Sequence, residues 1–270
     1  MGSPVPVLGQ EVPVYTGQRE RFCLATAVLH YAAAAVTDRG RKRTSNEDAF
    51  GLSVEHGVYI VCDGMGGAAA GEIASSLAVD EMMRVLKARG SNENTPASKL
   101  IAEAVAEANE AIFARAQRNP RLSGMGTTLV GLVARENRVW VINIGDSRCY
   151  RMRGRRLEQL TEDHSLVEEQ VRMGRMTESE ALRSPFRNVI TRALGTQPSV
   201  SPDIRELEAD AGDLFMLCSD GLTRELSDDL IESLLCLDLG LENLCGRLVH
   251  AAKKAGGHDN ITCLLVRAVG

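Results

Sequence analysis

Apolar residues follow two different periodicities along this chain of 270 residues. Short apolar runs bounded by polar or glycine-containing turns predict β-strands. These runs cover residues 29–36, 58–62, 127–134, 139–144, 149–153, 214–218 and 261–269. Two longer segments, about 71–88 and 96–117, repeat their apolar residues at intervals of three and four, which predicts amphipathic helices. Thr95 is expected to cap the second helix, with Pro96 at its first position.

The order of these elements indicates the fold class. The short polar turns Glu136-Asn137 and Gly145-Asp146 separate consecutive strands and favour antiparallel pairing. Helices grouped between runs of strands predict an α+β fold built in layers. The sequence shows no internal repeat and no linker, so we expect one domain over residues 28–270. Residues 1–27 are interpreted as a flexible lead, with or without a contribution from an expression tag.

Composition and charge exclude several classes of protein. A hydrophobic content of 44% with 25% charged residues is typical of a globular enzyme. The net charge of −5 argues against nucleic acid as a partner. The seven cysteines contain no C-x-x-C pair, which favours reduced, buried thiols over disulfides or a thiolate zinc site.

One segment near the start also has the outline of a secretion signal. Arg19 and Arg21 precede an apolar run over residues 22–36, which ends in four alanines and a valine. The run starts late, contains His30 and is shorter than the roughly 20 apolar residues of a membrane span. We therefore prefer a first β-strand and expect a cytoplasmic, monomeric protein with no membrane partner.

Acidic residues lie at the ends of four predicted strands, each beside glycine or asparagine. Asp63, Asp146 and Asp220 follow their strands, and Asp259 precedes the last one. Any one of them alone is typical of a turn. Together, carboxylates on rigid strand ends can converge on one point, where a cation would relieve their repulsion. Oxygen ligands with no Cys or His nearby select Mg²⁺ or Mn²⁺ over Zn²⁺, and Gly64 leaves its carbonyl free to approach such an ion.

A fifth segment, residues 43–48, completes this candidate chemistry. Glu47 and Asp48 could bind a metal ion directly or through water. Arg43 could hold a phosphate group with its two-pronged guanidinium. The alternative interpretation of this segment is a solvated cluster of charges in a turn.

Six motifs in this order resemble those of the type-2C, metal-dependent protein Ser/Thr phosphatases of the bacterial branch. They are Arg43-x-x-Asn-Glu-Asp48-Ala, Asp63-Gly-Met-Gly-Gly67, Met125-Gly-Thr-Thr128, Gly145-Asp-Ser-Arg148, Ser219-Asp-Gly-Leu222 and Asp259-Asn260. The resemblance covers about residues 29–269. It implies a four-layer α-β-β-α sandwich, with two central antiparallel sheets flanked by helices. It also implies a mobile flap at about residues 165–194.

The resemblance further implies a binuclear metal centre. Asp63 would bridge two Mn²⁺ or Mg²⁺ ions, and the Gly64 carbonyl would bind one of them. Asp220 and Asp259 would complete the shell of the other ion. Glu47 and Asp48 would lie beside the second ion, directly or through ordered water.

Three further positions correspond to supporting roles in the family. Asp146, together with Asp220, would hold a third and weaker metal ion. Arg43 would bind the substrate phosphate. Asn260 would orient the neighbouring aspartate or a water molecule.

The implied reaction is hydrolysis of phosphoserine and phosphothreonine in proteins, with Ser/Thr kinases expected among the partners and substrates. A hydroxide bridging the metal ions would attack phosphorus directly, with no phosphoenzyme. Some family members carry a histidine in place of Met65 or just after Gly67, proposed as general acid. Here these positions are Met65 and Ala68, so metal-bound water is the candidate acid.

Two competing interpretations are less favoured. A phosphatase-like regulatory or binding module without turnover is disfavoured because every metal-ligand position carries the expected acid. Two C-x5-R strings, starting at Cys149 and Cys218, have the spacing of cysteine-dependent phosphatases. Asp220 close to Cys218 would repel a phosphate, so we expect a thiol buried in the core instead.

His258 is interpreted as a loop histidine, and His164 as a residue for capping, packing or the flap.

Overall fold

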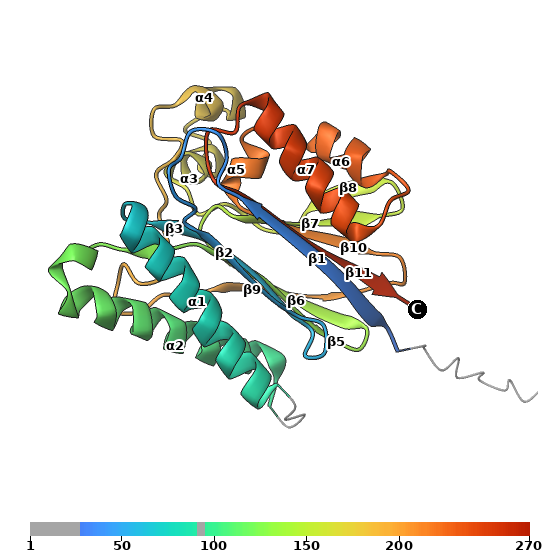
Figure 1. Ribbon diagram of the computed structural model, residues 1–270, viewed down its shortest axis with the longest axis horizontal. Coiled ribbons are helices and arrows are strands. Elements are labelled where there is room, and N and C mark those ends of the chain that lie inside the picture. Colours follow the sequence, from blue (N-terminus) through green and yellow to red (C-terminus); the bar gives the residue numbers. More distant parts are fainter. Residues whose placement is uncertain (1–27, 91–94) are drawn as a thin grey trace, which may run out of the picture.

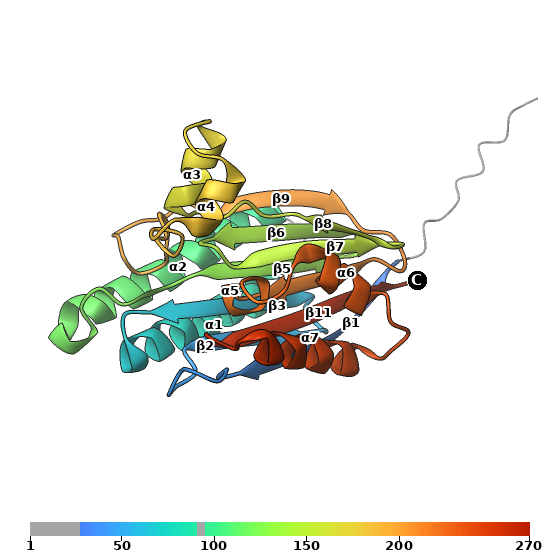
Figure 2. The same cartoon turned by 90° about the horizontal axis from the view of Figure 1, so that it is seen from above.

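The computed structural model describes residues 28–90 and 95–270, so the predicted lead of residues 1–27 lies outside the described residues. Two antiparallel β-sheets lie face to face at the centre, and helices cover the outer face of each sheet (Figures 1 and 2). This arrangement confirms the predicted α+β sandwich of four layers. In the described part of the chain, no helix is long and apolar enough to cross a membrane.

The first sheet has the strand order β2-β3-β5-β6-β9, and β4 pairs with β3 at its end. Its strands are β2 (Asp48–Ser53), β3 (Val58–Met65), β4 (Gly126–Thr127), β5 (Leu129–Arg135), β6 (Arg138–Ile144) and β9 (Asp203–Glu208). Two long helices, α1 (Ala68–Arg89) and α2 (Ala97–Arg118), cover its outer face (Figure 1). A short 3₁₀ turn at Pro120–Leu122 follows α2.

The second sheet has the strand order β1-β11-β10-β7-β8. Its strands are β1 (His30–Asp38), β7 (Arg148–Arg153), β8 (Arg156–Gln159), β10 (Leu214–Cys218) and β11 (Ile261–Val269). The helices α5 (Asp220–Thr223), α6 (Asp228–Leu235) and α7 (Leu241–Ala255) pack on its outer face. Because β1 is present, the segment with the outline of a secretion signal contributes a strand, as expected.

The strands in the middle of each sheet are apolar on both faces, because helices cover one face of the sheet and the other sheet covers the opposite face. Along β3, Ile60 and Cys62 face the helices α1 and α2, whereas Tyr59 and Val61 face the other sheet. From the second sheet, Phe215, Leu217, Leu264 and Val266 complete the core between the sheets. Alternation of side chains along a strand therefore places one half of every apolar run in each core.

One predicted strand pairing is wrong. The turn Glu136-Asn137 joins the paired strands β5 and β6, as expected. The turn at Gly145-Asp146 instead carries the chain from β6 in the first sheet to β7 in the second. Gly145 has φ of 107°, and a Cβ there would lie 2.6 Å from the Thr128 side chain. This crossing between the sheets therefore requires glycine at position 145. A hairpin turn also favours glycine, so the sequence alone does not distinguish the two.

The start of α2 differs by one residue from the prediction. The helix begins at Ala97, with Pro96 rather than Thr95 as its N-cap. Pro96 has an extended backbone, with ψ of 133°, so it lies before the first helical residue. Shifts of one residue at a helix end are common because the terminal turn is only partly hydrogen-bonded.

The predicted flap, residues 165–194, forms two short helices, α3 (Leu166–Arg172) and α4 (Glu178–Arg183), at one edge of the sandwich (Figure 2). Ser165 caps α3 and Thr177 caps α4 in a reciprocal capping box with Glu180. These caps satisfy backbone amides that such short helices would otherwise leave without partners. Isolated bridges, Ser165 to Ile190 and Thr127 to Leu194, anchor the two ends of the flap.

Candidate metal centre

The ends of β3, β6 and β10 bring the predicted acids together at one end of the sandwich. In Figure 1 the loop before β2, the helix α5 and the flap helices lie together at this end. Asp48 and Asp63 are directly opposite each other in the ladder of β2 and β3. Asp220 begins α5 immediately after β10. The predicted convergence of the strand-end carboxylates is therefore observed.

Asp63 lies at the centre of this cluster. Burial raises the pKa of its carboxyl group well above the ordinary value, and the charges of Asp48, Asp220, Asp146 and Asp259 raise that pKa further. Four neighbouring acids thus act on one side chain. A carboxylate in this position is strongly disfavoured unless a cation accompanies it.

Asp48 is held by one of its two carboxylate oxygens. The hydroxyl groups of Ser219 and Thr262 donate to its Oδ2 atom at 2.8 and 2.6 Å. Its Oδ1 atom is buried and has no hydrogen-bond partner. Burial raises the pKa of Asp48 to about 6, despite these two hydrogen bonds.

Asp146 and Asp220 show the same pattern. Both residues are buried, and the Oδ1 atom of each lacks a hydrogen-bond partner. Burial, followed by the charge of Asp146, raises the pKa of Asp220 to about 8. Buried polar atoms without partners are rare and costly.

The three unpartnered oxygens test whether the cluster fits a divalent ion. A hard cation such as Mn²⁺ or Mg²⁺ binds carboxylate and carbonyl oxygens, and every residue of the cluster offers oxygen. Among the described residues, no three acidic, His or Cys side chains stand together as a ready-made ligand set. The guanidinium group of Arg224 lies among the carboxylates instead, with contacts to Asp146, Asp220 and Asp259. The oxygen donors of the cluster fit Mn²⁺ or Mg²⁺. Bound ions would share these carboxylates with the guanidinium group of Arg224.

Glu47 lies beside the first turns of α1, next to Gly71 and Ser75. Burial raises the pKa of its carboxyl group. The backbone carbonyl of Glu47 accepts hydrogen bonds from the Ser75 hydroxyl at 2.6 Å and from the Gly64 amide at 3.1 Å. A Cβ on Gly71 would lie 2.0 Å from the Glu47 carboxylate, and a Cβ on Gly64 would lie 2.1 Å from the Gly71 carbonyl. Two glycines thus make room for this acid.

Asn260 supports the site differently from the expectation. It does orient Asp259, but through its backbone amide, which donates to Asp259 Oδ1 at 2.8 Å. Its side chain ties down the loop before β2. The Oδ1 atom accepts from the Glu47 amide at 2.8 Å, and the Nδ2 group donates to the carbonyls of Arg39 and Ser45.

Arg43 lies at the mouth of the cluster with its side chain 48% exposed. Its guanidinium group donates to Asp259 Oδ2 at 2.8 Å. A half-exposed guanidinium beside the acids can contact an entering anion, so the position agrees with the predicted phosphate-binding role. The pair with Asp259 means that a phosphate would compete with this carboxylate.

A large cleft leads from the acidic cluster to the flap. Its volume is about 1080 Å³. Asp146, Asp220 and Arg224 line one side, and Glu168 and Glu178 of the flap helices line the other. Residues of the two flap helices therefore border this cleft.

Sequence patterns did not assign two residues of this region. Arg224 follows Asp220 by four residues, one helical turn, which is the spacing at which an arginine meets a carboxylate. His164 is buried and contacts the loop of Asp146, since its Nδ1 atom accepts a hydrogen bond from the Gly145 amide at 3.1 Å. The interpretation of His164 as a flap and packing residue is closest to this geometry.

Cys218 is a buried core thiol, as predicted. Burial raises its pKa to about 12, so its thiolate form is scarce at neutral pH. A nucleophilic cysteine needs a lowered pKa. The environment of Cys218 therefore does not favour the interpretation of the C-x5-R spacing as a cysteine-phosphatase motif.

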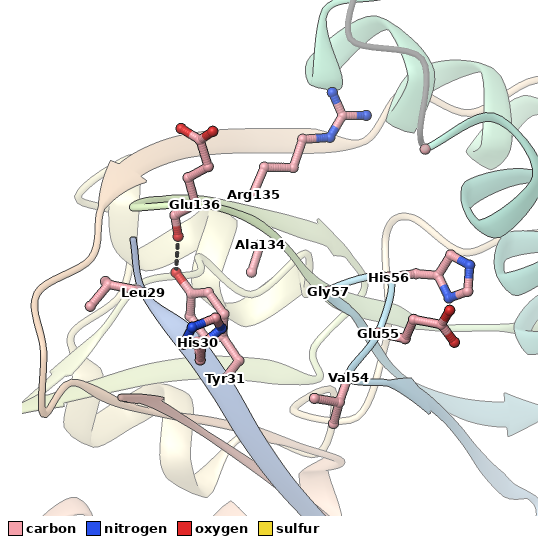
Figure 3. Close-up of a pocket in the computed structure, with 11 residues that line it drawn as sticks. Leu29, His30, Tyr31, Val54, Glu55, His56, Gly57, Ala134, Arg135 and Glu136 are labelled. Atoms are coloured by element: carbon pink, nitrogen blue, oxygen red, sulfur yellow. Dashed lines mark hydrogen bonds between the residues drawn. The ribbon is translucent and has the colours of Figure 1, made fainter. Parts of the chain in front are cut away.

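A second hollow, of about 520 Å³, is lined by a separate set of residues (Figure 3). The start of β1 and the β2–β3 and β5–β6 turns line it, and the Tyr31 hydroxyl donates to the Glu136 carbonyl across it at 2.9 Å. None of the acidic residues of the cluster lines this hollow. The chemistry predicted from the sequence thus belongs to the larger cleft.

Several known proteins are similar to this chain in both sequence and fold. Residues 37–264 match the family model of protein phosphatase 2C. The serine/threonine protein phosphatase PstP of Mycobacterium tuberculosis is 40% identical over 247 residues, which are 90% of this chain and 46% of PstP. The serine/threonine phosphatase stp of Listeria monocytogenes is 37% identical over 234 residues, which are 85% of this chain and 93% of that protein. The chain thus spans about half the length of PstP.

Solved structures agree with these relatives. A crystal structure of Mycobacterium tuberculosis PstP/Ppp has a TM-score of 0.82 at 36% identity, covering 90% of this chain and all of that one. A crystal structure of the PstP catalytic domain in complex with two manganese ions has a TM-score of 0.81 at 36% identity, with the same coverage. Family model, relatives, fold and the clustered acids agree, and this chain belongs to the protein phosphatase 2C family.

Proposed function

We propose that this chain is a metal-dependent phosphoprotein phosphatase that hydrolyses phosphoserine and phosphothreonine. One observation carries the proposal. Buried carboxylates with unpartnered oxygens stand close to Asp63, and two of them, Asp146 and Asp220, line a cleft of about 1080 Å³. Mutually repelling acids of this kind require cations, and the open cleft gives a phosphorylated side chain access to them.

The residues present would hold two Mn²⁺ or Mg²⁺ ions. Asp63, the Gly64 carbonyl, Asp220 and Asp259 would hold these ions, and Glu47 and Asp48 would contact one of them directly or through water. When bound, the two ions supply a water of lowered pKa and screen the charge of the phosphoryl group. The PstP catalytic domain, crystallised in complex with two manganese ions, supports this number of core ions.

The side chains contribute positioning and charge. Asp48 is fixed by Ser219 and Thr262, so only its Oδ1 atom is free to face an ion or its water. Asn260 holds the Glu47 segment against β11, which keeps the acids of the loop and of the strand in register. Arg43 would bind the non-reacting phosphate oxygens as a two-pronged donor.

The substrates we propose are phosphorylated proteins, Ser/Thr kinases among them. The names of the relatives, which are serine/threonine phosphatases, support this substrate class. We also propose a reducing, cytoplasmic setting. The six cysteines in the described part of the chain are all free thiols, five of them buried, as expected where disulfides do not form.

The experiment is phosphate release from a phosphothreonine peptide and from p-nitrophenyl phosphate, with added Mn²⁺ and with a chelator. We expect hydrolysis of both compounds that requires the metal and is lost in Asp63→Asn. An Asp80→Asn variant, altered at an exposed position on α1, serves as the matched control and should retain full activity. Absence of metal-dependent release, or equal activity in Asp63→Asn, would leave only a binding module.

A further inference from the structure

Arg224 is the one cation that contacts three acids of the cluster at once among the described residues. Its guanidinium group pairs with Asp220, lies 3.6 Å from Asp146 Oδ2 and lies 3.7 Å from Asp259 Oδ2. Its side chain is 34% exposed, and the residue lines the cleft together with Asp146, Asp220 and Asp259.

The backbone fixes this placement. Arg224 is the C-cap residue of α5, and its amide donates to the Asp220 carbonyl at 2.8 Å. One helical turn therefore separates the arginine from the aspartate that begins the helix. The helix packs closely against the chain before β11 at its start, where a Cβ on Gly221 would lie 1.9 Å from the Asn260 carbonyl.

We propose that the guanidinium group of Arg224 takes the place of a third divalent cation between Asp146 and Asp220, so that the loaded centre holds two ions. The inference rests on the proposed function, because it concerns the same metal centre. It replaces the third, weaker ion that the family resemblance assigns to these two aspartates.

The charges of the centre support two ions rather than three. Six carboxylates gather there: Glu47, Asp48, Asp63, Asp146, Asp220 and Asp259. Two divalent ions together with the guanidinium groups of Arg43 and Arg224 neutralise them completely. A third divalent ion would give the site a surplus of positive charge and would lie beside a resident guanidinium. The positive charges of such an ion and of the guanidinium group, both in contact with the same aspartates, would repel each other strongly in a partly buried site.

The geometry also limits where a third ion could bind. The Oδ2 atoms of Asp146 and Asp220 both face the NH2 group of Arg224. An ion between these aspartates would have to displace the arginine from both. Removing the charge of Arg224 should therefore create a third site, whereas keeping the charge should not.

The test counts bound ions without any substrate. Chelator-treated protein is dialysed against millimolar Mn²⁺, and the bound metal is measured by mass spectrometry. We expect two ions per chain in the wild type and in Arg224→Lys, and three in Arg224→Gln. In calorimetric titrations the third ion should bind Arg224→Gln at least about tenfold more tightly than the wild type.

Two further variants locate the effect. The double variant Arg224→Gln/Asp146→Asn should return to two ions, which assigns the third ion to Asp146. Arg118→Gln, at the exposed end of α2 and away from the cleft, should bind two ions like the wild type. Three ions in the wild type, with the same affinity as in Arg224→Gln, would overturn the role of Arg224 and leave the proposed function intact. Absence of any bound Mn²⁺ would instead end the proposed function.

A second measurement covers the case in which Arg224→Gln folds poorly. In the presence of chelator, Arg224→Gln should melt at a lower temperature than the wild type, and Arg224→Lys should melt close to the wild type. Added Mn²⁺ should close this gap, since metal ions then supply the missing positive charge. Equal melting temperatures for all three proteins in chelator would contradict the inference.

Discussion

The Nδ1 atom of His164 lies 3.1 Å from the backbone nitrogen of Gly145, the residue that precedes Asp146. On the far side of the ring, Nε2 lies 2.9 Å from Asp203 Oδ2. The Gly145 amide can only donate, so Nδ1 accepts that bond, and Nε2 faces both Asp203 and the Arg192 guanidinium, the latter at 3.3 Å. The backbone carbonyl of His164 accepts from the Thr191 amide at 2.8 Å. One histidine therefore joins the loop of Asp146 to the base of the flap.

Replacing His164 with phenylalanine should loosen both the Asp146 loop and the flap. The substitution keeps a planar aromatic ring, although a larger one, and a buried amide loses its acceptor, which costs about 1–3 kcal/mol of folding free energy. We expect faster hydrogen exchange over residues 165–194 and a decrease in kcat/KM of roughly tenfold. His56→Phe is the control, because the ring of His56 pairs with Ser53, at 2.9 Å and away from the cleft. Unchanged exchange in the flap would contradict this coupling.

The metal-free protein should lose stability as the pH rises from 5 to 8. Burial raises the pKa of Asp48 to about 6 and that of Asp220 to about 8, against about 3.9 in an unfolded chain. A carboxyl group with a higher pKa in the folded state binds its proton more tightly there, so ionisation above the unfolded pKa destabilises the fold. Acids with lowered pKa values, such as Asp38 and Asp203, exert their effect below about pH 4.

Urea unfolding in chelator should therefore give a free energy of unfolding that falls by on the order of 3 kcal/mol across this range. The fall should be complete near the folded pKa of Asp220 and should largely disappear in saturating Mn²⁺. A free energy that rises with pH in chelator would show that the acids are not held against their mutual repulsion.

The elements that could be predicted from the sequence are the buried ones, because a buried strand or helix face needs a run or a periodic pattern of apolar residues. The strands β10 and β11 have the predicted bounds because both of their faces are covered. The strands β8 and β9 are largely polar and give no such pattern. They are held by backbone pairing and by ion pairs across the ladder, such as Arg138 with Glu206 at 2.8 Å.

The site likewise contains residues whose place could be predicted from the sequence and residues whose place could not. Four of its carboxylates, Asp63, Asp146, Asp220 and Asp259, could be predicted because each stands next to the end of an apolar strand, where the backbone fixes its position. The contacts of His164 with Gly145 and Asp203 could not, since they join three segments that no periodicity relates. The crossing at Gly145 could not be predicted for a related reason, because a glycine-aspartate turn serves a hairpin and a change of sheet equally well.

Asp63→Asn should stabilise the metal-free protein while removing its response to metal. The substitution deletes the most strongly repelled charge of the cluster, opposite Asp48 in the ladder of β2 and β3. We expect a gain of roughly 1–3 kcal/mol at pH 8 in chelator, from unfolding curves. The control Asp80→Asn should change neither the stability nor the response to Mn²⁺. A destabilised Asp63→Asn protein would mean that this carboxylate is not under strain without metal.

Two helical glycines allow a matched test of the space around Glu47. Alanine normally stabilises a helix by about 1 kcal/mol relative to glycine. Gly246 in α7 has open space where a Cβ would stand, so Gly246→Ala should show this gain. At Gly71 in α1 the Cβ would collide with the Glu47 carboxylate, so Gly71→Ala should destabilise the fold and weaken Mn²⁺ binding. Thermal melts and metal titrations measure both effects, and a stabilised Gly71→Ala protein would contradict the tight packing.

His258 is the one histidine among the residues that line the cleft, so it is the histidine to test as a donor of a proton to the leaving group. It lines the cleft beside Asp259, but its side chain is 71% exposed and its Nδ1 atom lies 2.7 Å from Glu225 Oε1. Its ring is therefore tied to Glu225 rather than aimed at the acids. We expect His258→Asn to change turnover of a phosphoserine peptide by no more than about threefold.

The comparison that decides this point uses two leaving groups. A serine alkoxide needs a proton as it leaves, whereas p-nitrophenolate does not, so loss of a general acid slows only the first reaction. We expect the ratio of the two rates in His258→Asn to equal that of the wild type, with Glu225→Gln as the control for the broken pair. A drop of about a hundredfold in phosphoserine turnover, with aryl phosphate turnover unchanged, would assign the acid to His258 and exclude the expectation that no side chain delivers this proton.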